Sequence, residues 1–387
     1  MMEKVRLGDI CNILNGYAFK SSEYKESGIR VIRITNVQSG YIEDKEPKYY
    51  SFEKKTEIEK YMLKDNDILI SLTGNVGRVG LLKREMLPAA LNQRVACIRI
   101  KENKNISIDY IFNILNTKKF LKQCEINSKG IAQKNLSTEW LKNYLIDIPD
   151  FRKQAEISNK LDKVQKIIDL RKKQIEELDG LIKSKFVEMF GNLENNKWKM
   201  EKLDNVTFKI TDGKHGGCKR KENSGYYFVG ATEIYNDRIN YEMANQITEE
   251  EFKKDYNRCD LKIDDFVIVN TGATIGKNAI VDDKICNNIL LQKSVALIRV
   301  NKQYMLPIYL KYCYDCNPSL YSKGQGCARV NLLLSQIRNT TIPMPPIELQ
   351  NQFEEFVKQI NRQKFIIKKS LKETEELQES LMNKYFE

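Results

Sequence analysis

The sequence predicts an α/β fold of the α+β kind, in which two repeated mixed α/β domains are separated and joined by two long antiparallel coiled-coil helices. Short motifs recur at an offset of about 196 residues, and each copy is followed by about 40 residues with heptad-spaced apolar side chains. The 387 residues are also too many for one comfortable core. The expected domains are 1–150 and 193–346, and the expected helical regions are 151–192 and 347–387.

Anchor residues at a constant offset of 196 positions fix the two ends of the repeated unit. They are Leu7 with Leu203, Asn135 with Asn331, and Pro149 with Pro345. Between these anchors the register shifts, because Asp67 of DNDILIS corresponds to Asp265 of DDFVIVN at an offset of 198. The interior loops of the two copies therefore differ in length.

Each copy begins with strand-like segments and continues with a helical pattern. In the first copy we expect strands at VIRIT (31–35), DILISLTG (67–74) and VACIRI (95–100), and a helix at 109–124. The second copy repeats them as YYFVGATEI, DDFVIVNTG and SVALIRV, with a helix at about 306–317. In each copy a loop with Gly and Asn then leads to a short strand that ends at proline.

The segments after the two prolines are highly charged and carry apolar residues at the 4,3 spacing of a heptad seam. In the first segment the seam residues are Ile157, Leu161, Val164, Ile168, Ile175, Leu178, Ile182 and Met189, interrupted by Arg171. In the second segment they are Phe353, Val357, Ile360, Ile367, Leu371, Leu381 and Tyr385, interrupted by Lys364, Thr374 and Gln378. Leu377 is expected to fill the gap that Gln378 leaves.

Two such helices cannot each bury a seam alone, so the simplest arrangement packs them against each other. Because the units are duplicates, an antiparallel pair would relate them by a pseudo-two-fold axis. That is the geometry of a dimeric DNA-binding protein that reads two half-sites, contained in a single chain.

The charge balance favours a polyanionic partner. Lys and Arg number 64 and Asp and Glu 52, which gives a net charge of +12. A membrane surface would satisfy the same charge, but no apolar run approaches the roughly 20 residues of a spanning helix, and MMEKVRLGDI has no signal-peptide core. We therefore expect a cytoplasmic protein that associates with the nucleoid through DNA and has no membrane partner.

The nine cysteines of a cytoplasmic chain are expected to be reduced thiols, mostly packed as small apolar residues. Only Cys313 and Cys316 have CxxC spacing, and a structural zinc site needs two further ligands at similar spacing. Cys327 lies nearby, but no second pair follows. We expect no metal site.

Several paired segments carry a family resemblance over essentially the whole chain. TGNVGRVG pairs with TGATIGKN, GIAQKNLS pairs with GCARVNLL, and TDGKHGG lies at 211–217, with a long helix after each copy. In this layout the sequence resembles the specificity subunit of Type I restriction-modification systems, with its two target-recognition domains and two conserved helical regions. It departs from the family's commonest form at Arg329, where the first copy has Gln133.

The resemblance implies that this chain selects the DNA sequence and that partner subunits perform the chemistry. Two modification subunits, which carry the S-adenosylmethionine site, would assemble on double-stranded DNA with this chain. A restriction subunit with motor and nuclease activity is an optional further partner. The chain itself would hold no cofactor and no catalytic residue, and its helices would set the spacer of the target and dock the modification subunits.

The residues independently favour a non-catalytic chain. GATIGKN has one residue too few between its glycines for a phosphate loop, and Asn278 stands where Ser or Thr would hold magnesium. No NPPY-like methyltransferase segment is present, and the only histidine, His215, leaves no histidine acid–base pair. Two other classes stay open. One is a coiled-coil adaptor or structural DNA-binding protein, and the other is a nuclease. The E-x-K pattern of Glu53 and Lys55 adds no support for a nuclease, because a chain with 30% charged residues contains such a pattern by chance.

The glycine segments are expected to bring backbone N–H groups close to DNA phosphates, with Arg78 and Lys277 adding charge. A structural hairpin turn with a solvated cation is the alternative. Bases are read by directional donors and acceptors, which the front loops supply. The DNA contacts expected in the first domain are Lys20, Ser21, Ser22, Arg33, Thr35, Asn36, Thr73, Asn75, Arg78, Arg94, Gln133 and Lys134. Those expected in the second are Lys214, His215, Lys219, Arg220, Lys221, Thr274, Lys277 and Arg329. Because the loops differ, the two half-sites should differ and the target should be asymmetric and bipartite.

Overall fold

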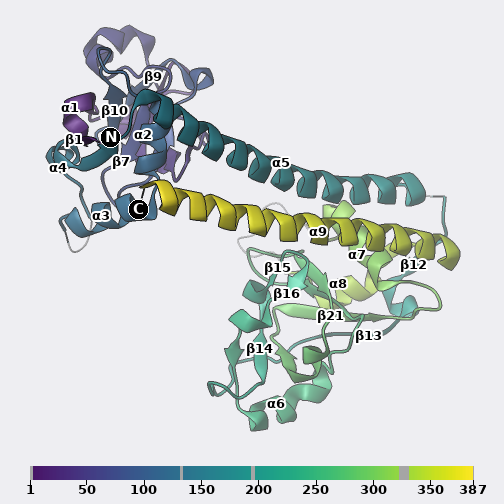
Figure 1. The fold of residues 1–387 in the computed structure, drawn as a ribbon. Helices are drawn as coiled ribbons and strands as arrows, with labels where there is room; N and C mark the ends of the chain where they lie inside the picture. Colours follow the sequence, from purple (N-terminus) through teal and green to yellow (C-terminus); the bar gives the residue numbers. More distant parts are fainter. Residues whose placement is uncertain (1–2, 131–133, 193–196, 322–330, 387) are drawn as a thin grey trace. The chain divides into compact units, whose positions relative to one another are not determined.

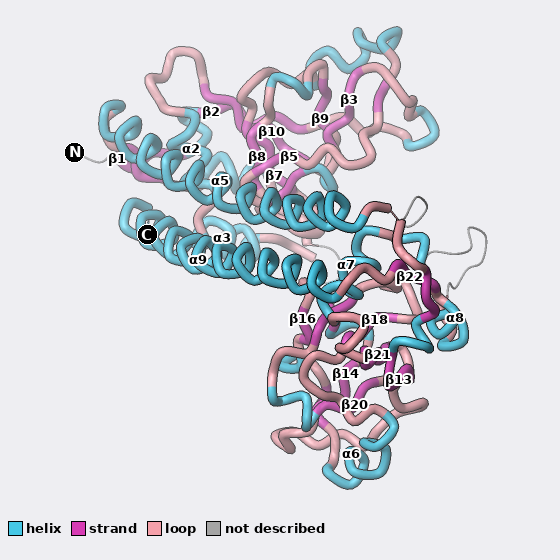
Figure 2. The backbone as a smooth tube through the Cα atoms, turned by 90° about the vertical axis from the view of Figure 1, so that its right-hand side faces the viewer, coloured by secondary structure: helices cyan, strands magenta, loops and turns pink. Residues whose placement is uncertain are grey.

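The computed structural model describes residues 3–130, 134–192, 197–321 and 331–386, and the chain divides into two compact units. The first unit comprises Met1–Arg171 together with Lys369–Glu387, and the second comprises Lys172–Lys368. Figure 1 traces the chain from its N-terminus to its C-terminus, and Figure 2 distinguishes helices, strands and loops.

The core of the first unit is an antiparallel sheet with the strand order β2-β10-β7-β8. A second sheet has the order β6-β3-β9, in which β3 and β9 are parallel. The strands are β2 Cys11–Asn15, β3 Ile29–Ile32, β6 Tyr49–Tyr50, β7 Ile68–Ser71, β8 Val79–Leu81, β9 Ala89–Leu91 and β10 Val95–Ile100. Two short pairs complete the unit: β1 Glu3–Arg6 with β11 Leu145–Ile148, and β4 Val37–Gln38 with β5 Tyr41–Ile42.

The second unit repeats this topology strand for strand. Its sheets have the orders β13-β21-β18-β19 and β17-β14-β20, and β14 and β20 are again the parallel pair. The strands are β13 Thr207–Asp212, β14 Tyr227–Val229, β17 Asn245–Gln246, β18 Phe266–Val269, β19 Asn278–Ile280, β20 Ile289–Leu291 and β21 Val295–Val300. The short pairs are β12 Met200–Lys202 with β22 Thr341–Pro343, and β15 Ile234–Tyr235 with β16 Arg238–Ile239. The predicted repeat of a mixed α/β unit is confirmed.

One predicted helix is wrong in its extent. The segment expected as a single helix at 109–124 forms two, α2 Ile108–Leu115 and α3 Lys118–Asn127. Thr117 explains the break, because its hydroxyl donates to the carbonyl of Ile114 at 2.8 Å and accepts from the backbone N–H of Phe120 at 3.1 Å. It thereby caps the start of α3. In the second unit the helix expected at about 306–317 is confirmed as α7 Pro307–Cys316.

A buried aspartate holds the central strands of each unit together. Asp67 is 2% exposed and accepts two hydrogen bonds from the guanidinium of Arg99 on β10, at 2.7 and 2.6 Å. In the second unit Asp265 is 1% exposed and accepts two from Arg299 on β21, both at 2.8 Å. The planar fork of arginine suits this bidentate contact. The sequence match of Asp67 with Asp265 therefore corresponds to a shared cross-strand ion pair.

The long helices α5 Phe151–Phe190 and α9 Ile347–Phe386 lie side by side within each unit (Figure 1, Figure 2). They are antiparallel, since Gln165 contacts Gln378 and Arg171 contacts Thr374 in the first unit. The seam residues that are buried are Ile157, Leu161, Val164, Ile168, Ile182, Phe353, Val357 and Ile360. Those that are partly buried are Ile175, Leu178, Met189, Ile367, Leu371, Leu381 and Tyr385.

Polar residues that interrupt the seam contact polar residues of the facing helix. Arg171 donates to the backbone carbonyl of Ser370 at 2.7 Å and to the hydroxyl of Thr374. In the second unit Lys364 forms an ion pair with Asp179. Each interruption therefore meets a polar partner rather than an apolar one.

The placement of Leu377 in the seam is wrong. Its side chain is 50% exposed, whereas Gln378 is partly buried and donates to the amide oxygen of Gln165 at 2.7 Å. A polar seam position can be filled by a hydrogen-bonded pair, so no neighbouring leucine needs to replace it.

We expect Asp67→Ala to reduce the free energy of unfolding by about 3 kcal/mol, because it leaves the guanidinium of Arg99 partly buried without its partner. Asp65→Ala, two residues away on the exposed side of the same turn, should change it by less than about 0.5 kcal/mol. Urea denaturation of the full chain, followed by circular dichroism, measures both. Equal losses for the two variants would contradict a structural role for the ion pair.

Candidate nucleic-acid interface

Four loop segments of the first unit meet through backbone hydrogen bonds, and we call them the loop junction: 15–17, 72–75, 91–94 and 134–136. The connecting N–H···O bonds run from Tyr17 to Leu91, Gln93 to Tyr17, Leu72 to Arg94, Leu136 to Leu72 and Gly74 to Lys134, at 2.8–3.0 Å. The two paired motifs of the sequence, TGNVG and KNL, are thus neighbours in space, joined by a bridge between Thr73 and Asn135.

The second unit has a loop junction with four of the same connections, formed by 212–214, 270–272, 291–294 and 331–332. Its N–H···O bonds run from Lys214 to Leu291, Lys293 to Lys214, Asn270 to Ser294 and Leu332 to Asn270, at 2.8–3.0 Å. Thr271 and Asn331 form the bridge that corresponds to Thr73 and Asn135. The duplicated motifs therefore build the same local backbone twice.

A glycine makes the closest approach in each junction. A Cβ on Gly16 would lie 2.3 Å from the carbonyl carbon of Asn92, and one on Gly213 would lie 2.1 Å from the carbonyl oxygen of Leu291. Any other residue would force these segments apart. The match of NGY at 15–17 with DGK at 212–214 was missed in the sequence, although its offset of 197 lies between the two offsets already found.

Both units carry exposed cations in the junction segments or close to them in the sequence. In the first unit they are Lys20, Arg94 and Lys134, and in the second they are Lys219, Arg220, Lys221 and Lys277. Within the described ranges none of these side chains forms an ion pair with a carboxylate. Ser21, Ser22, Thr35, Asn75 and His215 are also exposed, whereas Thr73 and Thr274 are partly buried. The cations are available to an anionic ligand such as DNA, whereas Nε2 of His215 lies 3.3 Å from a carboxylate oxygen of Asp212.

The two glycine turns differ in their cations. Arg78 is partly buried and donates to the amide oxygen of Gln38 at 2.8 Å, so the structural alternative applies to it. Lys277 is exposed at the corresponding turn of the second unit. Its charge is therefore available to a phosphate, whereas that of Arg78 is partly engaged within the protein.

The expectation that Asn36 reads a base is wrong. Asn36 is buried, its amide nitrogen donates to the carbonyl of Glu43, and its amide oxygen accepts the backbone N–H of Arg33, both at 2.9 Å. Arg33 is partly buried as well and donates to the carbonyl of Glu46 at 2.8 Å. From the sequence alone, polar side chains that form hydrogen bonds within a turn cannot be distinguished from polar side chains that are free to contact bases.

The expectation that Lys214 contacts DNA is also wrong. Its ammonium group lies 2.6 Å from Glu251 and 2.7 Å from Asp255, and its side chain is 12% exposed. Hydrogen bonds to Asp255 and Glu251 raise the pKa of Lys214. Both carboxylates belong to α6 Glu249–Asp255, a helix that the loop sequence alone did not place nearby.

Gln133 and Arg329 lie outside the described residues. Cys327 does too, while Cys313 is buried in the core of the second unit, where burial raises the pKa of its thiol. In the parts of the chain that the structure covers, no three His, Cys, Asp or Glu residues are grouped as a metal would require. No helix among these residues has the length and apolar character to cross a bilayer.

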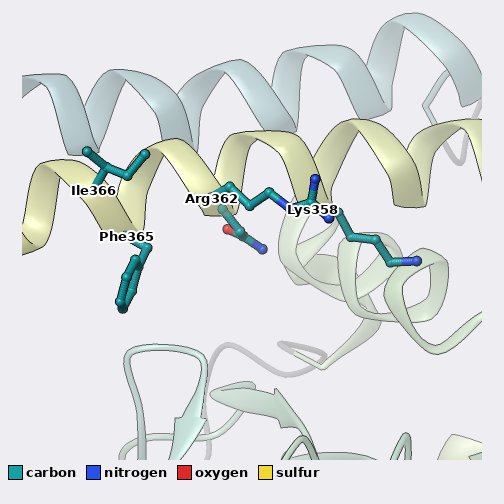
Figure 3. A pocket seen from close by; sticks show the side chains of 5 residues that line it. Lys358, Arg362, Phe365 and Ile366 are labelled. Atoms are coloured by element: carbon teal, nitrogen blue, oxygen red, sulfur yellow. The ribbon is translucent and has the colours of Figure 1, made fainter.

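The long helices also expose apolar residues away from their seam. Lys358, Asn361, Arg362, Phe365 and Ile366 line an open hollow on α9, and Phe365 projects from the helix on the side away from α5 (Figure 3). Ile366 is 65% exposed, and Leu170, its counterpart at the 196-residue offset, is 62% exposed. Leu181 and Leu377 form a second exposed pair at this offset.

A duplicated α/β unit with a basic loop junction, joined to two antiparallel helices, defines a class: single-chain DNA-binding proteins with two related recognition units. Comparison with known proteins agrees with this class. Residues 1–179 and 195–378 match the family model described as the Type I restriction modification DNA specificity domain. The chain therefore belongs to this family.

Similar proteins span most of the chain. The type I restriction enzyme EcoBI specificity subunit of Escherichia coli is 24% identical over 390 residues, covering 92% of this chain and 78% of that protein. The crystal structure of the Type-I restriction-modification system S subunit from M. genitalium has a TM-score of 0.53 at 14% identity, and covers 100% of this chain and 96% of that one. A chain from a structure of a type I R-M system, solved to explain its assembly and conformational transition, has a TM-score of 0.58 at 15% identity, covering 100% and 97%. At these identities the two structures establish the fold.

We expect Lys214→Met to reduce stability and Lys219→Met to reduce DNA binding, because the first side chain is paired with carboxylates and the second is not. Lys214→Met should lower the free energy of unfolding by about 2 kcal/mol, since it leaves Glu251 and Asp255 without their cation. Lys219→Met should leave stability within about 0.5 kcal/mol of the parent and weaken binding to duplex DNA.

Urea denaturation and fluorescence anisotropy with duplex DNA at two salt concentrations measure the two effects. The assignment of Lys214 to a structural ion pair is refuted by a Lys214→Met variant that is as stable as Lys219→Met.

Proposed function

We propose that this chain is the DNA-specificity subunit of a Type I restriction-modification complex, and that each unit reads one half of an asymmetric bipartite target. The observation that carries the proposal is the loop junction, which has the same backbone connections in both units but different exposed side chains. A shared frame suits contact with the regular phosphate backbone, whereas differing side chains suit different base sequences.

The chain itself performs no chemistry in this proposal. Two modification subunits, which carry the S-adenosylmethionine site, methylate the DNA that this chain selects, and a restriction subunit is an optional further component. The complex works in the cytoplasm, on nucleoid DNA. The pattern of exposed side chains supports this division, because the loop junctions offer cations and hydrogen-bonding groups for binding, without a histidine acid–base pair.

The two helices dock the modification subunits in this proposal. Leu170 on α5 and Ile366 on α9 are exposed apolar residues at equivalent positions of the repeat. Exposed apolar residues in a defined patch favour a protein contact. Exposed apolar residues at equivalent positions of the two units favour two copies of one partner.

A complex reconstituted from this chain and its modification subunit tests the proposal. We expect two modification subunits per chain by light scattering, and methylation at one asymmetric bipartite sequence when genomic DNA is treated and sequenced. The chain alone should show no methyltransferase, nuclease or ATPase activity. Nuclease activity from the chain alone would instead favour the nuclease alternative, and methyltransferase or ATPase activity would contradict a non-catalytic chain.

Charge substitutions at Leu170 and Ile366 test this docking surface, with Gln363→Asp as the matched control. Leu170→Asp and Ile366→Asp should each release one modification subunit, because a carboxylate in an apolar contact is left without a partner. Gln363→Asp changes an exposed polar position one turn before Ile366 and should leave two subunits bound. Retention of both subunits by Leu170→Asp and Ile366→Asp would place the docking surface elsewhere.

The lengths of α5 and α9 should set the spacer of the DNA target. Four helical residues inserted after Arg171 and four after Lys368 lengthen each helix by about 6 Å, or nearly two base pairs of roughly 3.4 Å. Paired insertions keep Arg171 opposite Thr374 in the first unit and Asp179 opposite Lys364 in the second. We expect the same two half-sites with a spacer about two base pairs longer, measured by sequencing methylated DNA.

Paired two-residue insertions at the same points serve as the control. They turn each helix by about 200°, which moves the seam away from its partner and should abolish assembly. An unchanged spacer with the four-residue insertions would mean that the helices hold the units together without determining the distance between half-sites.

A further inference from the structure

Each loop junction contains a tight turn whose backbone forms hydrogen bonds within the turn and to the neighbouring loops. In the first unit the turn runs from Asn92 to Val95, closed by the N–H of Val95 donating to the carbonyl of Asn92 at 2.9 Å. The N–H of Arg94 also donates to the side-chain oxygen of Asn92 at 3.1 Å. The neighbouring loops bond Gln93 through its N–H and Arg94 through its carbonyl. The turn therefore has little freedom to move.

The equivalent turn of the second unit runs from Gln292 to Val295 and is closed in the same way, at 2.9 Å. The N–H of Lys293 donates to the carbonyl of Lys214 at 3.0 Å, as that of Gln93 does to Tyr17 at 2.9 Å. The carbonyl of Ser294 accepts from Asn270 as that of Arg94 accepts from Leu72. The two turns therefore have the same backbone hydrogen bonds, although the loops around them differ in sequence and length.

The side chains at the first corner of these turns are exposed and differ. Gln93 stands in the first unit and Lys293 in the second, and within the described residues neither side chain has a hydrogen-bond partner or an ion pair. An immobile backbone that presents an unengaged polar side chain loses little conformational freedom on binding. This combination suits a residue that reads a ligand rather than one that stabilises the fold.

We propose that Gln93 and Lys293 are specificity-determining residues, each reading one base of the half-site that its unit recognises. The inference rests on the proposed function of the chain. The amide of glutamine can bond both N6 and N7 of adenine, whereas the ammonium of lysine bonds O6 and N7 of guanine. Gln93 therefore reads an adenine in the first half-site, and Lys293 reads a guanine in the second. The cations around each junction hold the phosphates on either side.

The test exchanges the two corners in the complete complex with modification subunits. Gln93→Lys should change one base of the first half-site from adenine towards guanine, and Lys293→Gln should change one base of the second from guanine towards adenine. We expect a loss of roughly 5- to 150-fold in methylation rate at the original sequence, which corresponds to one bidentate base contact. The other half-site should be unchanged in each case.

Gln303→Lys is the matched control. Gln303 is also exposed in a turn, from Asn301 to Tyr304, with an asparagine side chain that accepts from its N–H at 3.1 Å. That turn follows the opposite end of β21, so the substitution should leave the target sequence unchanged. Thermal melting of all three variants verifies that they fold.

The outcomes separate the inference from the proposed function. A parent complex without any sequence-specific methylation would refute the proposed function itself. A specific parent whose target is unaltered by both exchanges would overturn only the assignment of Gln93 and Lys293. A uniform fall in affinity at every sequence, with a weaker salt dependence, would also overturn it by identifying phosphate contacts.

Discussion

The packing of the end of α9 into the first unit is the constraint on which this architecture depends. Leu381, Met382, Tyr385 and Phe386 contact the core that contains Ile157 and Leu161 of α5, and the rings of Phe386 and Tyr110 lie 5.4 Å apart. The first unit is therefore assembled from both ends of the chain. Its core is complete only when the end of α9 has packed against it, so segments far apart in the sequence build one core. The four consecutive segments expected from the sequence do not show that the end of α9 belongs to the core of the first unit.

In the second unit both helices contribute to one core within a continuous stretch of chain. Phe186 of α5 and Phe353 of α9 lie with their rings 5.4 Å apart, among other aromatic residues of α7. Apolar packing alone would tolerate several alignments of two long helices. The polar contacts of Arg171 with Thr374 and of Lys364 with Asp179 favour one alignment, because any shift would leave a partly buried charge without its partner.

The sequence was informative where one periodic signal decides the structure, and much less so where distant segments meet. Heptad spacing predicted α5 and α9, and apolar runs predicted β10 and β21 at their observed positions. Leu377 was misplaced because periodicity cannot show that two glutamines will bond across a seam. Lys214 and Asn36 were misassigned because a polar residue in a loop looks the same whether its partners are protein or DNA. The loop junction was visible only as separate motifs, since nothing in a linear pattern shows which loops will share backbone hydrogen bonds.

Duplication separates two requirements that a recognition unit must satisfy. Asp67 with Arg99, and Asp265 with Arg299, secure the same strands in both units, while Gly16 and Gly213 let the same loops approach. These residues are buried or sterically confined, so a substitution there would disturb the fold itself. The exposed side chains of the junction can be replaced without disturbing the fold. Their backbone is held by hydrogen bonds that any residue except proline can form. Exposed residues can therefore change the sequence that a unit reads at little cost in stability, which explains how two copies of one frame come to present such different surfaces.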